Sequence, residues 1–251
     1  MDKVILTPWN IGQEHICCAM SDKKSADGVN AKKEWLACRM EEGLKFVKLN
    51  VRGKVFIEYL PAECAWVPVE AEGYTFINCF WVSGAFKGHG YGRELLRVCE
   101  EDVVGTNGVV VMAGKKKLPY LSDKAFFIKH GYEVCDTWGA NIELLVKRFN
   151  PDVPFPRFKT CTSAGLGENV EGIDIFYTAQ CPFTMPYIKL LAPVIQSSEI
   201  PVRVHPITTR EMAREHCVPF TTYSVFVNGK FYSHEILTPA KLQKLLAGVQ
   251  V

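Results

Sequence analysis

Residues 87–93 read KGHGYGR, with a glycine at every second position between a lysine and an arginine. The segment follows the apolar run FINCFWV and precedes ELLRVCEEDV, whose residue patterns predict a strand and a helix. One glycine suffices for an ordinary turn, so three of them indicate that the backbone comes close to a ligand. Unpaired N–H groups at a helix N-terminus favour a negative charge. The segment therefore predicts an anion-binding loop, in which Lys87 and Arg93 add positive charge.

Two common nucleotide-binding patterns are excluded at this loop. The chain contains no G-x-x-x-x-G-K-[ST] segment, which removes the P-loop interpretation. The dinucleotide fingerprint fails because Gly88-His89-Gly90 would need a third glycine at position 93, which is Arg93.

The composition limits the class of protein and its partners. The chain has 251 residues, of which 48% are hydrophobic, enough for buried cores. Lysine and arginine number 29 against 27 aspartates and glutamates, and a net charge of +2 argues against nucleic acid as a partner. The sequence shows neither a signal peptide nor a long apolar run, so we expect a cytoplasmic protein with no membrane partner. Ten cysteines are scattered without a C-x-x-C pair, so we expect reduced, mostly buried thiols and no metal site.

A proline-rich segment divides the chain. Residues 150–172 contain three prolines in the first seven positions and then small and polar residues, which predicts a linker. We therefore predict one domain over residues 1–149 and a second over residues 173–251. In the first domain, residue periodicity predicts strands over 55–60, 65–69, 74–82, 108–114, 132–138 and 142–149, and helices over 91–103 and 123–131.

The second domain has the element order of a compact thioredoxin-like unit. This order is βαβαββα, and its two consecutive strands form a hairpin around Asn228-Gly229. Its predicted elements are strands 173–178 and 200–207, the hairpin 222–236, and helices 185–198, 208–216 and 238–249. The predicted fold class of the whole chain is therefore α/β.

Several segments carry a family resemblance. Residues 87–92, KGHGYG, resemble the acetyl-CoA loop of the GNAT N-acetyltransferases, [QR]-x-x-G-x-[GA], with Lys87 in place of Gln or Arg. TFINCFWV is similar to the family's fourth strand, GVVVMAG to its fifth, and KAFFIKHGYEV to a later segment. With CPFT and PFTTYSVFVNGKF, nearly the whole chain resembles the acetyltransferases that carry a YoaP-like C-terminal domain. The resemblance implies a mixed, splayed central sheet, acetyl-CoA as cosubstrate, and acetylation of an amine. We expect a small-molecule acceptor because the sequence contains no peptide-recognition signal.

The resemblance also implies where acetyl-CoA binds. Backbone N–H groups from Lys87 to Arg93 would hold its pyrophosphate, and the N–H group of Val82 would bind the thioester carbonyl oxygen. The residues expected to contact acetyl-CoA are Trp81, Val82, Lys87, Gly88, His89, Gly90, Tyr91, Gly92, Arg93, Phe126 and Phe127.

The sequence leaves the general acid open. In the family a tyrosine stands two residues before the K-x-G-[FY] segment, and here Phe127 takes that place. Phenylalanine cannot donate a proton to the departing thiolate. Three alternatives remain: unassisted departure, donation by another group such as Tyr120, Ser122 or Tyr132, and loss of transferase activity.

The general base is equally open. Glu58 and Glu70 lie on predicted strands and are candidates to face the cleft, although a strand carboxylate more often points to solvent. Asn78 and Cys79 lie on the central strand near the expected acetyl group. Cys79 is either a nucleophile or a small core hydrophobe.

A second group of residues suggests thiol chemistry. The segment IDIFYTAQCPFT resembles the start of a thioredoxin or glutaredoxin domain, with Cys181 at a helix N-terminus that favours a thiolate. Thr184 fills the place of the second cysteine, and a cis Val218-Pro219 bond is implied opposite Cys181. Cys217 is a candidate resolving thiol.

The sequence favours an acetyl-CoA-dependent N-acetyltransferase with a thioredoxin-like appendage. Three further interpretations, two of the whole chain and one of the appendage, stay open. The first is a monothiol, glutaredoxin-like protein that uses Cys181 and keeps the first domain for binding or sensing CoA. The second is a non-catalytic CoA-binding module, and the third is a C-terminal unit that has lost its thiol chemistry and only packs or binds. The sequence also leaves a homodimer open.

Overall fold

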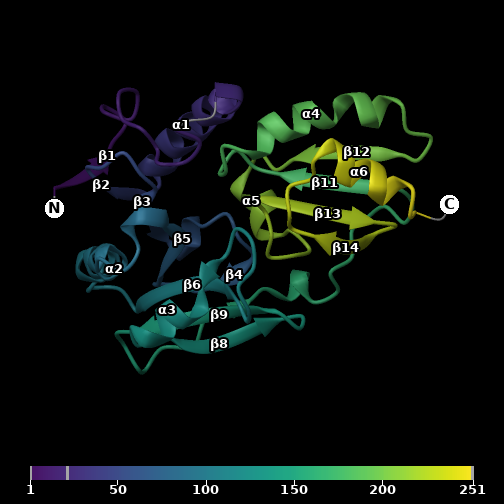
Figure 1. The fold of residues 1–251 in the computed structure, drawn as a ribbon. Helices are drawn as coiled ribbons and strands as arrows, with labels where there is room; N and C mark the ends of the chain where they lie inside the picture. Colours follow the sequence, from purple (N-terminus) through teal and green to yellow (C-terminus); the bar gives the residue numbers. More distant parts are fainter. Residues whose placement is uncertain (1, 21–22, 250–251) are drawn as a thin grey trace. The chain divides into compact units, whose positions relative to one another are not determined.

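The computed structural model describes residues 2–20 and 23–249. These residues form two compact units, which are described separately (Figure 1). The first unit contains residues 2–18, 36–65 and 69–159, and the second contains residues 19–20, 23–35, 66–68 and 160–249. Among the described residues, no helix has both the length and the apolar character that crossing a membrane requires.

An eight-stranded mixed sheet forms the centre of the first unit (Figure 1). Its strand order is β1-β2-β3-β5-β6-β9-β8, and β7 pairs with β6 as well. The β5–β6 and β6–β7 pairs are parallel and the others are antiparallel, so the predicted mixed sheet is confirmed. The strands are β1 (Lys3–Leu6), β2 (Lys45–Leu49), β3 (Val55–Pro61), β5 (Thr75–Val82), β6 (Gly108–Gly114), β7 (Ser122–Asp123), β8 (Glu133–Trp138) and β9 (Ile142–Arg148). A separate two-stranded sheet pairs β4 (Val69–Glu70) with β10 (Arg157–Phe158).

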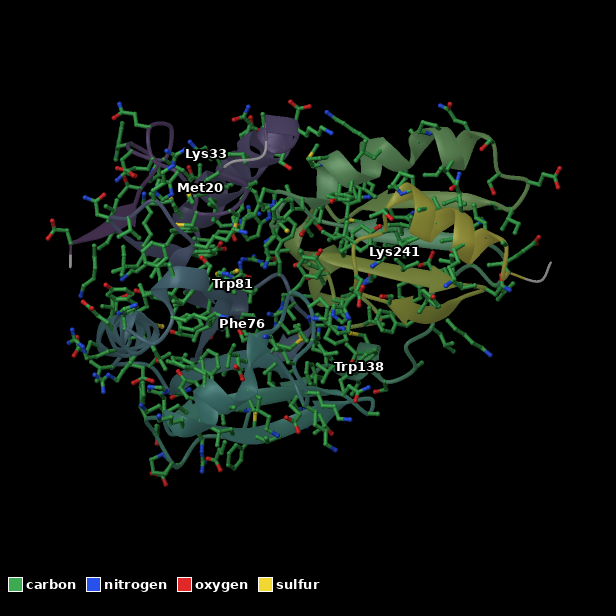
Figure 2. The ribbon with its side chains drawn as sticks, viewed as in Figure 1. Met20, Lys33, Phe76, Trp81, Trp138 and Lys241 are labelled. Atoms are coloured by element: carbon green, nitrogen blue, oxygen red, sulfur yellow. The ribbon has the colours of Figure 1, made fainter. Side chains whose placement is uncertain are left out.

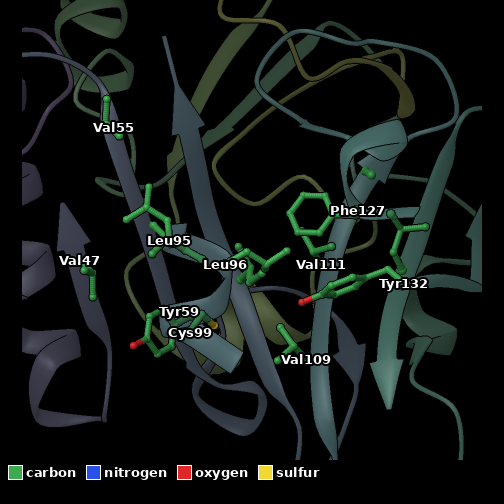
Figure 3. Packing of buried hydrophobic residues seen from close by; sticks show 14 of the residues in the cluster. Val47, Val55, Tyr59, Leu95, Leu96, Cys99, Val109, Val111, Phe127 and Tyr132 are labelled. Atoms are coloured by element: carbon green, nitrogen blue, oxygen red, sulfur yellow. The ribbon is translucent and has the colours of Figure 1, made fainter. Parts of the chain in front are cut away.

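Helices α2 (Tyr91–Asp102) and α3 (Lys124–Lys129) build the core of the first unit on one face of this sheet (Figure 3). The buried residues of α2 are Leu95, Leu96 and Cys99, which pack against β3 and β5. Helical spacing in the sequence predicts that Leu95, Val98 and Cys99 share one face. The structure confirms this, because Leu95 and Cys99 are buried and Val98 packs against the same core. The core fixes the start of α2, and with it the KGHGYGR loop, beside the end of β5.

Helix α1 (Ala26–Glu41) contributes to both units. Its residues 26–35 belong to the second unit and its residues 36–41 to the first. Four 3₁₀ turns complete the described structure: η1 (Lys23–Ser25), η2 (Ala62–Cys64), η3 (Gly84–Phe86) and η4 (Thr160–Thr162).

A four-stranded sheet with the order β12-β11-β13-β14 forms the second unit. The β11–β12 pair is parallel, and the other two pairs are antiparallel. Its elements follow the order β11 (Ile173–Tyr177), α4 (Thr184–Gln196), β12 (Val202–Pro206), α5 (Arg210–Arg214), β13 (Tyr223–Val227), β14 (Lys230–Ser233) and α6 (Pro239–Leu246). The predicted βαβαββα order is therefore confirmed. Asn228 and Gly229 both have positive φ angles, 47° and 74°, as a two-residue Asn-Gly hairpin turn requires.

Sequence periodicity missed every element before residue 55 and misplaced one strand after it. It predicted nothing before residue 55, where β1, α1 and β2 lie. The buried side of α1 carries Gly28 and Lys32, so its residues lack the apolar repeat that predicts a helix. Of the residues in the predicted strand 65–69, only Val69 pairs with another strand, as part of β4.

The segment 150–172 carries local structure that its composition did not predict. It contains β10 and η4, the carbonyl oxygen of Pro154 accepts a hydrogen bond from Tyr74 at 2.9 Å, and the ring of Phe155 lies 3.8 Å below the Arg148 guanidinium. Its first part packs on the first unit and its second part belongs to the second unit. The domain boundaries given from the sequence stay a prediction.

The ten cysteines are reduced, but most of them are not buried. Cys17 and Cys99 are buried, Cys38 is exposed, and the other seven are half-buried. The prediction that they serve mainly as buried hydrophobes is therefore wrong for eight of the ten.

Candidate functional site

The central sheet opens between β5 and β6. These strands pair only from Thr75–Ile77 to Val109–Val111. Beyond Ile77, strand β5 continues through residues 78–82 with β3 alone, while the end of β6 pairs with β7. Within the described chain, one edge of β5 therefore has no strand partner over its last five residues. Over residues 80–82, the backbone N–H groups that point to this edge are available to an acceptor.

A β-bulge lies where the opening begins. On β3, Glu58 is paired with Cys79 and Tyr59 with Ile77, which leaves Asn78 as an extra residue on β5. A bulge bends its strand and increases its twist. The bulge thus coincides with the point at which β5 leaves β6.

The KGHGYGR loop follows directly after this open edge. Turn η3 precedes it, and the N–H group of Lys87 donates to the carbonyl oxygen of Gly84 at 3.1 Å. The first residue after the loop with a bonded N–H group is Glu94, which donates to Gly90. Within the described chain, the N–H groups of residues 88–93 have no hydrogen-bond acceptor. The expectation that free N–H groups begin at Lys87 is corrected, because they begin at Gly88.

The three alternating glycines serve different purposes. Gly88 and Gly90 both have a φ angle of 80°, a conformation that L side chains rarely adopt. A Cβ atom at Gly88 would meet nothing within 4 Å, and Gly90 is the left-handed N-cap of α2. A Cβ atom at Gly92 would lie 3.2 Å from the Phe126 ring and 3.4 Å from the Phe80 ring. Gly88 and Gly90 therefore shape the loop, and Gly92 lets α2 approach two aromatic rings.

The polar and aromatic residues of the loop are mostly exposed. Lys87, His89 and Arg93 are exposed, and the His89 ring lies beside the Tyr91 ring at a centroid distance of 5.8 Å. Trp81 is 42% exposed on β5, where Figure 2 labels it together with Phe76. Positive charge and unbonded N–H groups thus share one open surface.

Phe126 and Phe127 occupy different environments. Phe126 is half-buried, stacks on Phe80 at 5.1 Å, and adjoins Gly92. Phe127 is fully buried in the core, with its ring beside Tyr132 and Val111 (Figure 3). The expectation that Phe127 contacts acetyl-CoA does not fit this position, because the helical turn of α3 directs its ring into the core. Phe126 alone of the pair adjoins the loop.

The candidate proton donors are also separated. Ser122 lies on β7, pairs with Ala113 at the end of β6, and so stands where β5 and β6 part; β7 also contacts β5. Tyr120 is 58% exposed and has a φ angle of 62°. Tyr132 is buried, and this burial raises the pKa of its hydroxyl well above the ordinary value. Ser122 and Tyr120 therefore stay candidates, and Tyr132 is a core residue.

The two candidate bases have different surroundings. Glu58 is fully buried, its Cα position is paired with Cys79, and its Oε2 accepts a hydrogen bond from Asn78 at 3.2 Å. Glu70 lies on the small β4–β10 sheet and forms an ion pair with Arg157 at 2.5 Å. Glu58 therefore lies beside the opening, whereas Glu70 holds two short strands together.

The Glu58–Asn78 contact was not predicted from the sequence. Each residue had been placed near the site, but their contact depends on the register between β3 and β5 and on the bulge. The available signal was one polar residue, Asn78, within the apolar run FINCFWV.

A sequence relative decides the family. Over 243 residues the chain is 42% identical to the uncharacterized N-acetyltransferase YoaP of Bacillus subtilis (strain 168), a match that covers 96% of each chain. The chain belongs to the YoaP-like family. The YoaP-like family model matches residues 201–244, from just before β12 into α6.

Solved acetyltransferases are similar to part of this YoaP-like chain. Aminoglycoside 6′-acetyltransferase type Ii is 14% identical, with 61% of this chain and 100% of that chain covered and a TM-score of 0.44. PaiA N-acetyltransferase from Thermoplasma acidophilum, in complex with coenzyme A, is 15% identical, with 59% and 99% covered and a TM-score of 0.40. A GNAT family acetyltransferase from Brucella melitensis, in complex with acetyl-CoA, is 18% identical, with 61% and 92% covered and a TM-score of 0.36.

The residues assigned to the thiol site have different surroundings in the second unit of the YoaP-like chain. Cys181 is half-buried and packs against the α4–α6 side of the second unit. The Thr184 hydroxyl donates to the carbonyl oxygens of Thr178 at 2.7 Å and Cys181 at 2.8 Å, so it fixes the loop. The described chain contains no cis peptide bond, so the expectation for Val218-Pro219 is wrong.

Cys217 has a different neighbour from the one expected. Burial and the nearby Cys161 raise the pKa of the Cys217 thiol to about 11. The Cys161 thiol itself donates to the carbonyl oxygen of His216 at 3.5 Å. The structure therefore associates Cys217 with Cys161.

A hollow of about 320 Å³ lies at the other end of α2. Its walls include Leu6, Val98 and Asp102, and the Asp102 carboxylate is bonded there to Lys45 and Tyr59. None of the residues that the sequence assigned to the site lines this hollow. The open edge of β5 and the loop therefore remain the candidate site.

Proposed function

We propose that this YoaP-like chain is an acetyl-CoA-dependent N-acetyltransferase whose acceptor is a small-molecule amine. The observation that carries the proposal is the opening between β5 and β6 directly before a loop with six unbonded N–H groups. A thioester oxygen needs a fixed donor, and a pyrophosphate needs several N–H groups at a helix N-terminus. The open edge and the loop supply both kinds of donor in one unit.

The reaction makes one bond and breaks one. The amine nitrogen attacks the thioester carbonyl carbon, and the carbon–sulfur bond then breaks with its electron pair leaving on sulfur. The nitrogen loses a proton to a base, and the thiolate takes up a proton from an acid or from water. The protein must therefore orient the amine, stabilise the carbonyl oxygen and move two protons.

Three residues have the positions that these steps require. The N–H group of Val82, at the end of the open edge, is the proposed donor to the carbonyl oxygen. Glu58 is the proposed base, because it is a buried carboxylate beside the bulge whose Oε2 is held by Asn78. Ser122 is the proposed acid, since β7 places it where β5 and β6 part. Tyr120, two residues earlier, is the alternative donor.

The loop residues would hold the rest of acetyl-CoA. The N–H groups of residues 88–93 face no acceptor of the described chain and are oriented by the start of α2. Lys87 and Arg93 add positive charge at the exposed surface, and the ring of Phe126 packs against Gly92. These roles rest on the geometry of the unit and on its similarity to the family's loop.

Calorimetry and a turnover assay together test the proposal. Acetyl-CoA should bind with one site per chain, and at least one member of a panel of primary amines should release CoA thiol above the rate of hydrolysis. Absence of acetyl-CoA binding would rule the proposal out. Binding without turnover on any amine would replace it with a non-catalytic CoA-binding module.

A further inference from the structure

The first half of helix α1 packs on the Cys181 loop at Pro182 and Pro186. Both segments belong to the second unit, although they lie far apart in the sequence. A Cβ atom at Gly28 would collide with the carbonyl oxygen of Pro182 and would lie 2.8 Å from the Pro186 ring. Gly28, Pro182 and Pro186 are all buried. The helix can approach the loop this closely only because position 28 has no side chain.

Further contacts surround this crossing. Asp27, beside Gly28, forms an ion pair with Lys189 of α4 at 2.5 Å. One side of α1 is buried at intervals of three and four residues, at Gly28, Lys32 and Trp35, and Ser25 of the preceding turn η1 continues this spacing. This spacing corresponds to a single helix face. The whole first half of α1 therefore has a buried face.

A second segment of the chain adjoins the same end of the sheet. The Thr221 hydroxyl donates a buried hydrogen bond to the carbonyl oxygen of Trp66, and the Trp66 ring contacts the Trp35 ring edge-on at 5.9 Å. Thr221 lies beside the Cys181 loop, because the N–H group of Thr178 donates to the carbonyl oxygen of Thr222 at 3.2 Å. Residues 66–68 and α1 thus contact each other as well as the end of the sheet.

We propose that this end of the second unit, formed by residues 178–186 and 219–222, is an internal docking face. Its occupants are residues 25–35 and 66–68 of the same chain. Cys181 is half-buried. A disulfide partner must approach its sulfur in line, and on this proposal the docked helix hinders that approach. The segment that resembles a thiol active site therefore serves to bind this chain's own helix. The inference is independent of the proposed acetyltransferase activity.

Alkylation rates distinguish a docking face from a thiol site. A stabilised thiolate at a helix N-terminus predicts that Cys181 reacts quickly at neutral pH. A docking face predicts the opposite: iodoacetamide at pH 7.5 should modify Cys181 at least tenfold more slowly than the exposed Cys38, as followed by peptide mass spectrometry. If Cys181 of the unmodified chain reacts as fast as Cys38, the proposal is overturned.

Gly28→Val tests which contact closes the face. The added side chain should displace α1 from Pro182 and raise the alkylation rate of Cys181 at least tenfold, while Cys99 in the core of the first unit stays slow. Gly12→Val is the matched control, because a Cβ atom at Gly12 meets nothing within 4 Å. A folded Gly28→Val chain with an unchanged Cys181 rate would contradict the docking face.

A charge reversal provides a second variant that leaves the packing intact. Lys189→Glu would face Asp27 with a like charge, and we expect Cys181 to react about two- to fivefold faster. Asp27→Lys combined with Lys189→Glu restores an ion pair of reversed polarity and should return the rate to that of the unmodified chain. Equal rates in all three chains would count against the proposal.

Discussion

Two loops in this protein connect a strand to the N-terminus of a helix, and they differ in what surrounds them. The loop between β5 and α2 is exposed, and a Cβ atom at its Gly88 would meet no neighbour within 4 Å. The loop between β11 and α4 is covered, with Pro182 and Pro186 buried against Gly28. The first loop leaves six N–H groups without an acceptor, whereas the second is fixed by the Thr184 hydroxyl.

The comparison shows that a helix N-terminus is not sufficient for a ligand-binding site. Both loops place backbone N–H groups and a partial positive charge at the start of a helix. Only the first is open, and only the first adjoins a strand edge without a partner. The same local device can therefore bind a ligand in one unit and a segment of the chain in the other.

The largest expected effect tests the chemistry beside the open loop. Glu58→Gln keeps the size of the side chain and an oxygen for Asn78 but removes the base, so turnover should fall by about 10²-fold or more. The release of CoA thiol measures turnover, and calorimetry should show unchanged acetyl-CoA affinity. Glu70→Gln is the control, because Glu70 pairs with Arg157 away from the opening. Equal losses in the two variants would remove Glu58 from its proposed role.

A loss of similar size is expected at the proton donor. Ser122→Ala should lower turnover by about 10²-fold if the hydroxyl protonates the thiolate, and Tyr120→Phe should do so if the alternative donor acts. The same thiol-release assay measures both variants. If both retain full activity, the thiolate leaves without a protein acid.

The second unit should be less stable to unfolding at acidic pH. Burial lowers the pKa of His216 to about 4, and its Nε2 lies 3.0 Å from the Ser224 hydroxyl. In the unfolded chain, the imidazole of His216 takes up a proton near pH 6.5. The folded state excludes that proton down to about pH 4, so the free energy of unfolding is highest above pH 6.5 and decreases as the pH falls toward 4. The expected loss at pH 5 is about 2 kcal/mol.

Proteolysis in urea at pH 8 and pH 5 measures this effect through peptides of the second unit. His216→Gln keeps a hydrogen-bonding side chain without a titrating group, so it should lose most of the pH dependence. A pH dependence as large in the variant as in the unmodified chain would assign the effect to other groups.

Acetyl-CoA affinity should depend on the backbone conformation of the open loop. Gly90→Val places a branched side chain where φ is 80°, at the N-cap of α2, and should weaken acetyl-CoA binding at least tenfold, or about 1.4 kcal/mol. Gly105→Val serves as control, because a Cβ atom there meets nothing within 4 Å. Calorimetry with equal affinities for the two variants would exclude this loop as the binding site.

The smallest effect is expected at the covered loop. Cys181→Ser should leave acetyl-CoA affinity and turnover within about twofold, because direct attack of an amine needs no thiol relay. Abolished transfer with unchanged acetyl-CoA affinity would instead show that the second unit carries chemistry.

Local patterns predicted the parts of the fold that depend on neighbouring residues. The strand–loop–helix around KGHGYGR and the βαβαββα order both follow from periodicity and turn residues. Helix α1 escaped prediction because its buried face includes Gly28 and Lys32, whose burial depends on segments far away in the sequence. The assignment of Phe127 to the ligand failed for a related reason, since a one-residue step along α3 separates the core from the loop.

The sequence by itself determined the glycine-rich strand–loop–helix segment, the order of elements in the second unit and the resemblance to an acetyltransferase, because each is encoded within a short window. The tertiary structure decided which carboxylate stands beside the opening, since that depends on the β3–β5 register and on the bulge at Asn78. It also brought Gly28 of α1 against Pro182 of the Cys181 loop, a contact that exists only after the chain has folded. Residue periodicity reports on contacts between residues close together in the sequence. Access to a site depends on which segments, distant in the sequence, pack on it.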